Sequence, residues 1–176
     1  IAARVGLADL GLLGRADAIR QMPISLASAV TGRVYLAKFA DAFRADRQPT
    51  GAVAVEFHLA CRNTMLFAMP VLAYIFTFAS DIVRLLFGEQ WGASGKMLMC
   101  LVPGAVFFLL QSLCLNFLLG IGATSGYLRM EGVKKVVLLT SLLALITGSV
   151  YAYAIISSAA WAVVSILYLR VMMRLG

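Results

Sequence analysis

Three long stretches of the chain carry no charged residue, and they determine its predicted architecture. They cover residues 63–80, 97–128 and 136–169, which are 18, 32 and 34 residues long. Each is long enough to cross a membrane, because about 20 apolar residues in a helix span a bilayer. The longest exceeds one crossing, since a helix rises about 1.5 Å per residue. We therefore predict two spans there, joined by a turn near residues 148–158.

The segment from residue 12 to residue 39 has helical character although charged residues interrupt it. At 100° per residue, one face is polar and the opposite face is apolar. The polar face holds Asp17, Gln21, Ser25 and Ser28, with Arg20 and Thr31 beside it, and the apolar face holds Met22, Leu26, Ala29 and Val30. This pattern predicts a membrane helix with a polar stripe.

The sequence GIGATSGY at residues 120–127 is rich in glycine and predicts a loop. With that loop, the chain contains about five predicted membrane spans. They cover about residues 17–38, 58–80, 97–119, 134–150 and 155–171. The fold class expected from them is all-α, a polytopic transmembrane helical bundle that forms a single membrane domain over residues 1–176.

Composition supports a membrane protein and excludes a soluble globular domain. Of 176 residues, 62% are hydrophobic and 13% are charged, with a mean hydropathy of +0.93; an average soluble domain is about 25% charged. The net charge of +7 is dispersed between apolar runs, which argues against nucleic-acid binding. Basic residues concentrate in the connections on one side, so we expect that side to be cytoplasmic.

The sequence contains no motif that is typical of a catalytic site or of a metal site. The three cysteines, Cys61, Cys100 and Cys114, have no metal-ligand spacing, and their odd number cannot pair completely within the chain. We find no grouping of a nucleophile with an acid or base, and no phosphate-binding glycine loop. We therefore expect no enzyme activity, no cofactor and no metal.

The sequence DIVRLLFGEQW at residues 81–91 lies between two predicted spans. Its apolar residues are mixed with Asp81 and Arg84, and it ends in a glycine and a tryptophan. This pattern predicts a short helix at the membrane surface that ends at Gly88, with Trp91 as an aromatic anchor.

The order of these segments resembles a known family of membrane carriers. The matching marks are Gly11, Arg15, Ala16 and Pro23 in LGLLGRADAIRQMPISL, Pro70, and Phe87, Gly88 and Trp91 in an F-G-x-x-W pattern. The chain resembles the polysaccharide-exporter and O-antigen-flippase branch of the multidrug/oligosaccharidyl-lipid/polysaccharide (MOP) flippase superfamily. It departs from that pattern at Leu13, where the family commonly has tyrosine.

The resemblance implies a MATE-like transporter fold with 12 to 14 helices, of which this chain would be a fragment covering the eighth to the twelfth. It implies a carrier in the bacterial inner (cytoplasmic) membrane that moves an undecaprenyl-pyrophosphate-linked oligosaccharide across the bilayer by alternating access. The oligosaccharide would be a repeat of lipopolysaccharide O-antigen or of an exopolysaccharide. Its expected partners are that lipid-linked oligosaccharide, membrane lipids, and H⁺ or Na⁺ as a coupling ion.

Polar and ionisable residues in the predicted spans are candidates for the transport path, because such residues are rare inside membranes. Arg15 and Arg20 could attract pyrophosphate or acidic sugars, with Asp17 paired to one of them; the alternative is that all three lie at the membrane surface. Gln21, Asn63 and Gln111 could bind sugar hydroxyls, or could serve only as hydrogen bonds between helices.

Three other functions remain open. The first is a multidrug carrier of the same superfamily, which would favour acidic residues over the two arginines of the first span. The second is a membrane enzyme of cell-envelope polysaccharide synthesis, which would require an acid/base pair that His58 alone does not provide. The third is a structural membrane subunit without a transport path.

Overall fold

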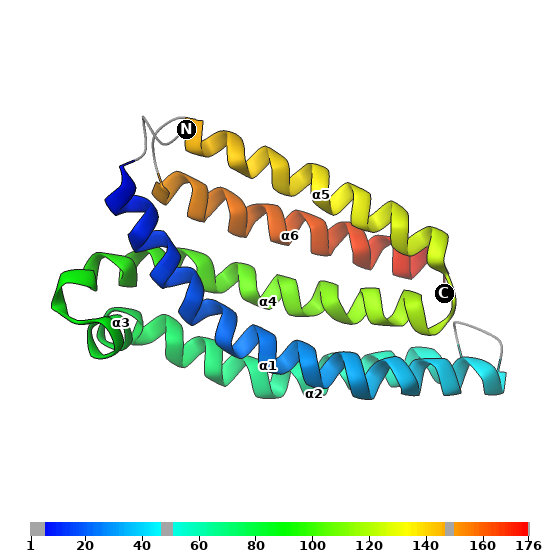
Figure 1. Ribbon diagram of the computed structural model, residues 1–176. Helices are drawn as coiled ribbons and strands as arrows, with labels where there is room; N and C mark the ends of the chain where they lie inside the picture. Colours follow the sequence, from blue (N-terminus) through cyan, green and yellow to red (C-terminus); the bar gives the residue numbers. More distant parts are fainter. Residues whose placement is uncertain (1–5, 47–50, 147–149, 176) are drawn as a thin grey trace.

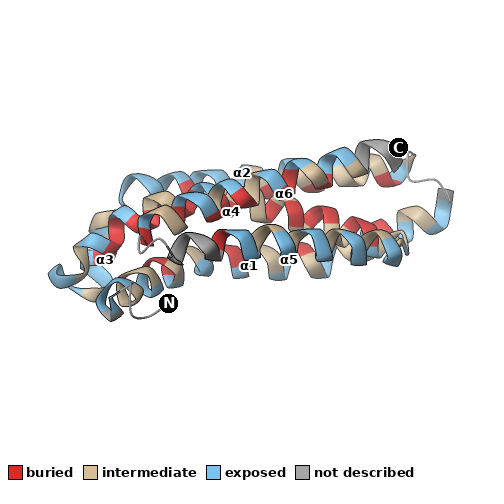
Figure 2. Ribbon diagram, turned by 90° about the horizontal axis from the view of Figure 1, so that it is seen from above, coloured by how far each residue is buried: buried red, intermediate tan, exposed pale blue. Residues whose placement is uncertain are grey.

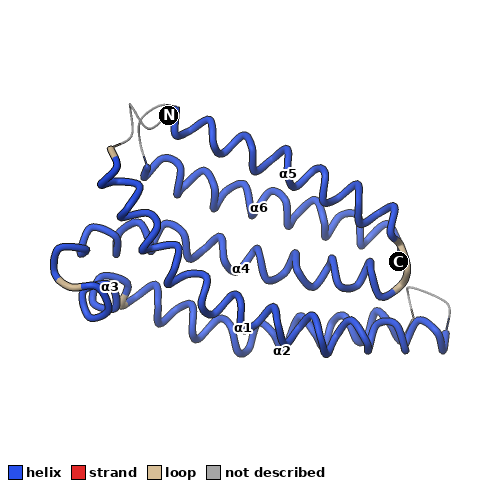
Figure 3. The backbone as a smooth tube through the Cα atoms, viewed as in Figure 1, coloured by secondary structure: helices blue, strands red, loops and turns tan. Residues whose placement is uncertain are grey.

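The computed structural model describes residues 6–46, 51–146 and 150–175. In this part of the chain the secondary structure is helical throughout, without strands (Figure 3). The elements are α1 (Leu7–Asp46), α2 (Ala52–Thr77), α3 (Ala79–Phe87), a short 3₁₀ helix η1 (Glu89–Trp91), α4 (Gly92–Gly120), α5 (Thr124–Ile146) and α6 (Val150–Leu175). The predicted all-α fold class is therefore confirmed.

The long helices lie side by side along one direction, and α4 is the central element (Figure 1). Helix α4 packs against α1, α2 and α6, and it also contacts α3 and, to a smaller extent, α5. It contributes many of the buried residues, which are coloured red on the ribbon of Figure 2. Helix α3 is seen end-on in Figure 1, so it lies across the direction of the long helices.

Two glycines allow the close approach of neighbouring helices to α4. A Cβ atom added to Gly95 would lie 2.5 Å from the Cα atom of Ser80, and one added to Gly120 would lie 2.6 Å from the Cβ atom of Phe39. Real Cβ atoms do not approach other atoms so closely, so any larger residue would force the helices apart. Small residues serve this purpose widely in membrane helix packing.

Two serine hydroxyls fix α6 against α4. Ser158 donates to the carbonyl of Cys100 at 2.6 Å, and Ser165 donates to the carbonyl of Phe107 at 2.7 Å. The two serines are seven residues apart, and so are the two carbonyls, which places the helices parallel and in matched register. Hydrogen bonds of this kind between membrane helices contribute on average about 0.6 kcal/mol each.

Two of the predicted boundaries are wrong. The expected loop over 120–127 is shorter, since α4 continues to Gly120 and α5 already begins at Thr124. The expected turn over 148–158 is also shorter, since α6 begins at Val150; residues 147–149 lie outside the described part. In the second place, Ser158, a side chain with low helix propensity, is held in the helix by its hydrogen bond to α4.

Three of the helices are long and apolar enough to cross a membrane. They are Ala52–Thr77, Val150–Val171 and the continuous stretch Glu89–Gly120. Helix α1 covers the predicted span 17–38 and carries charges along its length. Helix α5 covers residues 134–146 of the predicted span 134–150, and its charged residues all lie between 129 and 135. The bundle is therefore a polytopic membrane fold, while the number of five spans stays a prediction.

The short helix expected after the second span is confirmed. Helix α3 ends at Phe87, and the following Gly88 has a φ of 95°, a conformation that favours glycine. Ala79 and Val83 are fully buried against the bundle, whereas Leu85 and Leu86 are exposed.

Candidate functional site

A charged groove lies between α1, α5 and α6, with Leu101 of α4 also among its lining residues. Its volume is about 610 Å³, within the range of about 300–1,000 Å³ that is typical of ligand sites. Helix α1 contributes residues from Leu10 to Arg20, α5 from Glu131 to Ser141, and α6 from Tyr153 to Trp161. Residues from distant parts of the sequence thus meet at one cavity.

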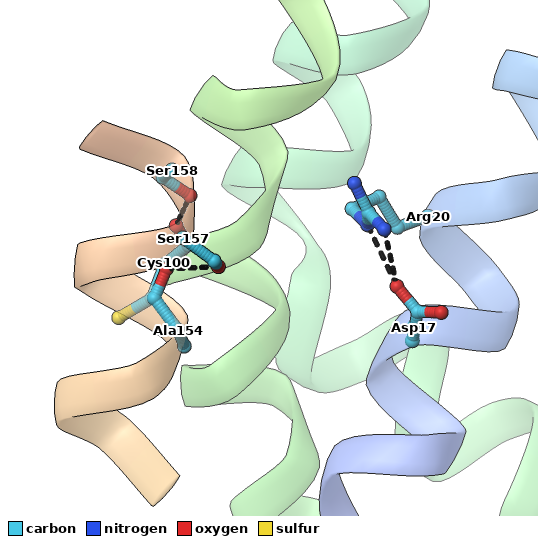
Figure 4. Close-up of polar contacts among 6 residues, drawn as sticks. All are labelled: Asp17, Arg20, Cys100, Ala154, Ser157 and Ser158. Carbon is cyan, nitrogen blue, oxygen red and sulfur yellow. Dashed lines mark hydrogen bonds and ion pairs between the residues drawn. The ribbon is translucent and has the colours of Figure 1, made fainter. Parts of the chain in front are cut away.

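The α1 side of the charged groove carries the ion pair of Asp17 and Arg20. The Arg20 Nε and Nη2 atoms both donate to Asp17 Oδ1, at 2.9 and 2.5 Å (Figure 4). The Arg20 side chain is only 11% exposed, while Asp17 is 41% exposed. The pair forms because residues three apart lie on the same side of a helix. Arg20 is thus held in a fixed position at the edge of the cavity.

The α5 side carries a second ion pair of the same spacing. Lys134 Nζ lies 2.5 Å from Glu131 Oε1, and both side chains are largely buried. The adjacent Lys135 also lines the charged groove. Among the described residues, no carboxylate is within ion-pair distance of Lys135.

The charge balance of the groove is therefore positive. Arg20, Lys134 and Lys135 contribute three positive charges against the two negative charges of Asp17 and Glu131. Each carboxylate is already paired with a cation on its own helix. The remaining charge favours an anion as ligand, because low-dielectric walls strengthen the attraction between unlike charges.

The α6 side is neutral and combines aromatic rings with hydroxyl groups. Tyr153, Ser157 and Trp161 are four residues apart in sequence, so they lie along one face of the helix. Ser158 lies beside them and also lines the groove. We call these four residues the α6 face of the groove.

The structure separates the six residues that the sequence suggested for the transport path. Only Asp17 and Arg20 lie together in the charged groove. Arg15 is exposed, and its guanidinium group lies 5.0 Å from the ring centre of Phe87 and 5.1 Å from that of Trp91. Arg15 therefore joins α1 to α3 and η1 through cation–π contacts, outside the residues that line the groove.

Two other predicted residues lie elsewhere on α1 and α2. Gln21 is exposed and does not line the charged groove. The Asn63 amide nitrogen donates to the Tyr35 hydroxyl at 3.4 Å. Asn63 and Tyr35 both line a second cavity, which lies between α1 and α2 and has a volume of about 440 Å³. Its lining is mostly apolar, and we call it the apolar groove.

Gln111, the sixth predicted residue, lies inside the bundle on α4 and is 2% exposed. Its Oε1 atom has no hydrogen-bond partner among the described residues, and neither does the hydroxyl of the equally buried Tyr168 on α6. Gln111 thus belongs to the contact of α4 with α6 and not to either groove.

Sequence reasoning missed the α5 and α6 residues of the charged groove. Lys134 and Lys135 stand at the start of the predicted span 134–150, whereas in the structure they lie inside α5. The spacing of Glu131 and Lys134 is the spacing of a helical ion pair, and it was available as a signal. The regular spacing of Tyr153, Ser157 and Trp161 was hidden by the turn expected over 148–158.

The arrangement can bind and orient a ligand, with anion-binding groups on two helices and neutral groups on the third. Among the described residues, no group of three or more His, Cys, Asp or Glu side chains could hold a metal ion. The groove can therefore recognise a ligand by ionic contacts and hydrogen bonds at a site between helices of the bundle.

Comparison with known proteins gives one match. A family model described as "Polysaccharide biosynthesis protein" matches residues 1–95. No curated protein and no solved structure matches the chain. The matched region covers α1, α2, α3 and η1, so it includes Asp17 and Arg20 on the α1 side of the charged groove. Since the match covers more than half of the 176 residues, the chain belongs to the polysaccharide biosynthesis protein family.

Proposed function

We propose that the chain is part of a carrier that moves a lipid-linked oligosaccharide across the bacterial cytoplasmic membrane. The cargo is an undecaprenyl-pyrophosphate-linked repeat of O-antigen or of an exopolysaccharide, and it passes from the cytoplasmic to the outer leaflet by alternating access. The family match and the membrane helices support an export role. No bond is made or broken in this process.

The charge of the groove is the observation that carries this proposal. A lipid-linked glycan has a pyrophosphate group, and its sugars can carry further acidic groups. Such a headgroup cannot enter the hydrocarbon of the bilayer without a large cost, because charged groups lose their hydration there. A groove between membrane helices that holds Arg20, Lys134 and Lys135 offers the anion compensating charges along its path.

The two ion pairs suit a site that must bind and then release its ligand. In each pair the cation, Arg20 or Lys134, is neutralised by a carboxylate three residues away, which lowers the cost of keeping it between helices. An arriving phosphate competes with that carboxylate for the same cation. Binding is therefore an exchange of partners, and its net free energy stays small enough for release on the other side. A proton or sodium gradient supplies the direction of transport.

A leaflet-accessibility assay in cells tests the proposal. In a strain that lacks the protein, we expect the lipid-linked repeat to accumulate on the cytoplasmic leaflet while its synthesis continues. The wild-type gene should restore delivery to the outer leaflet. The double variant Lys134→Ala, Lys135→Ala should restore less than about a tenth of it at an equal protein level in the membrane.

The chain provides a matched control for this experiment. Asp41 and Arg44 form an ion pair of the same spacing on α1, but both side chains are more than 70% exposed. The double variant Asp41→Ala, Arg44→Ala should therefore restore delivery fully. Normal delivery in the strain without the protein would refute the carrier function, and full delivery by the lysine variant would refute the role of the charged groove.

A further inference from the structure

The α6 face of the charged groove has a composition that anion binding alone does not require. Phosphate recognition needs cations and N–H donors, and these lie on α1 and α5. The α6 face instead presents Tyr153 and Trp161 with two serines between them. Aromatic rings with neighbouring hydroxyl groups suit a ligand that is apolar on one side and polar at its edges.

The ring of Trp161 packs against a second aromatic ring on α4. It meets Phe108 of α4 edge-to-face, with ring centres 5.0 Å apart and an interplanar angle of 78°. This is a favoured geometry for aromatic pairs. Trp161 is half-buried and lines the groove, so the contact with Phe108 positions it without covering it completely. A preorganised ring loses little conformational entropy when a ligand binds to it.

The serine hydroxyls among the residues that line the groove donate their protons to backbone carbonyls. Ser157 donates its proton to the carbonyl of Ala154, Ser158 to that of Cys100, and Ser141 to that of Leu138. A hydroxyl oxygen that has donated its proton still has lone pairs, so each can accept a hydrogen bond. The matching ligand therefore supplies hydroxyl donors to these oxygens, while its anionic group faces the cations of α1 and α5.

A sugar ring next to an anionic group meets these requirements. One face of a pyranose presents C–H groups, which are attracted to the negative face of an aromatic ring, and its edges carry hydroxyl donors. We propose that Trp161, Tyr153 and Ser157 form a sugar-binding subsite of the charged groove. A pyranose attached to the anionic group stacks on Trp161 there and donates to the serine oxygens.

This inference rests on the proposed function for the identity of the cargo, and it adds which helix recognises the sugar. Recognition is thereby divided between the helices of the groove. The cations of α1 and α5 bind the anion of any cargo, whereas α6 distinguishes a glycan from a bare lipid phosphate. Trp161 is then a specificity-determining residue and not only a packing residue of α4 and α6.

Binding measurements with the purified protein in lipid nanodiscs test the subsite. The probes are farnesyl pyrophosphate, a farnesyl-pyrophosphate-linked neutral trisaccharide, and the free trisaccharide. The wild-type protein should bind the linked trisaccharide more tightly than farnesyl pyrophosphate. Trp161→Ala should remove that preference by weakening the linked trisaccharide about two- to tenfold, the range expected for one aromatic contact. The affinity for farnesyl pyrophosphate should not change.

Two further variants separate recognition from packing. Trp161→Phe keeps an aromatic face and should retain most of the preference. Trp91→Phe changes the other tryptophan of the chain, which contacts Arg15 outside the groove, and should leave all affinities unchanged. Equal weakening of farnesyl pyrophosphate and the linked trisaccharide by Trp161→Ala would show a packing role only and would overturn the subsite. An unchanged preference would overturn it as well.

A fluorescence measurement keeps the inference testable if Trp161→Ala does not fold. In the Trp91→Phe variant, Trp161 is the only tryptophan, so its emission should shift saturably with the linked trisaccharide and with high concentrations of the free trisaccharide. Farnesyl pyrophosphate should cause no comparable shift. A shift that all three probes share equally, or no shift with bound linked trisaccharide, contradicts the subsite.

The same measurements distinguish failure of the subsite from failure of the proposed function. The double variant Lys134→Ala, Lys135→Ala should weaken both farnesyl probes and leave the free trisaccharide unchanged. If that variant binds both probes normally while Trp161→Ala loses the preference for the glycan, the anion site is wrong and the sugar subsite stands. If the wild-type protein binds none of the probes, both are wrong.

Discussion

The two grooves differ in chemistry although the same helix lines both. Along α1, the residues from Leu10 to Arg20 line the charged groove, and those from Pro23 to Tyr35 line the apolar groove. Helices α5 and α6 supply charges and hydroxyl groups to the first, whereas α2 supplies mainly Phe67, Val71 and other apolar side chains to the second. The neighbouring helices therefore decide whether a polar residue of α1 belongs to a ligand site.

The polar residues of the two grooves also have different partners. In the charged groove, Arg20 donates hydrogen bonds to Asp17. Lys135 lines the same groove, and no carboxylate among the described residues lies within ion-pair distance of it. In the apolar groove, Asn63 and Tyr35 bond each other at 3.4 Å, a long hydrogen bond. The first arrangement leaves charge available for a ligand, and the second bonds the Asn63 amide within the protein.

Charge reversal in the charged groove should have the largest effect. Arg20→Glu removes a cation and places a carboxylate beside Asp17, and two charges about 4 Å apart interact by about 4 kcal/mol at an effective dielectric constant of 20. We expect transport to fall by two orders of magnitude or more in the leaflet-accessibility assay. Arg44→Glu, at the exposed pair on the same helix, should leave transport nearly unchanged. Comparable transport by both variants contradicts the account.

A lysine placed in the apolar groove should lower the amount of inserted protein. A charge at the centre of a membrane helix costs about 2.5–3.5 kcal/mol, and the Ala68 position offers it no described carboxylate partner among the residues that line this groove. We expect Ala68→Lys to reduce the protein level in the membrane, measured by quantitative immunoblotting. Leu138→Lys, in the charged groove, should reduce it less because charged side chains already line that groove. Equal losses would show that the grooves do not differ in polarity.

Two arginines of α1 should respond differently to the same change. Arg15 lies against Phe87 and Trp91, and a cation–π contact at an exposed site contributes about 0.5–1 kcal/mol. Arg15→Ala should therefore lower thermal stability slightly and leave most transport activity intact. Arg20→Ala should lose transport by at least tenfold. If Arg15→Ala is the more harmful to transport at equal protein levels, the transport path has been assigned to the wrong face of α1.

The smallest effect is expected for the polar pair of the apolar groove. Tyr35→Phe removes the acceptor of the Asn63 bond, and such bonds between membrane helices contribute about 0.6 kcal/mol on average. We expect a stability change of that size in thermal unfolding and normal transport. A transport defect in a stable Tyr35→Phe variant would make the apolar groove part of the path of the glycan headgroup.

The sequence predicted the helices well, because charge-free runs of the required length leave few alternatives in a membrane. It failed where local propensity and tertiary contact disagree. Thr124 and Ser158 stand in sequences that suggest loops, yet α5 begins at the first and α6 includes the second. Ser158 is fixed by its bond to Cys100, 58 residues away, and local sequence rules hold no information about such a partner.

The candidate site was only partly predictable for a similar reason. The spacing of Asp17 and Arg20 indicated a pair on one helix face, and the structure contains that pair. Arg15 is five residues from Arg20, which turns it by about 140° onto another face. The residues that line the groove together with Arg20, such as Lys134, could not be identified from α1 alone. They depend on how α5 and α6 pack against α4.

Photo-crosslinking of the cargo tests the central claim most directly. The probe is a lipid-linked glycan that carries a diazirine on its first sugar. It is added to membranes that contain the protein and is activated by light, and mass spectrometry then identifies the modified residues. We predict modification of the first half of α1, of α5 and of α6 around Trp161. Modification confined to the apolar groove, or to the exposed face of α3, would contradict it.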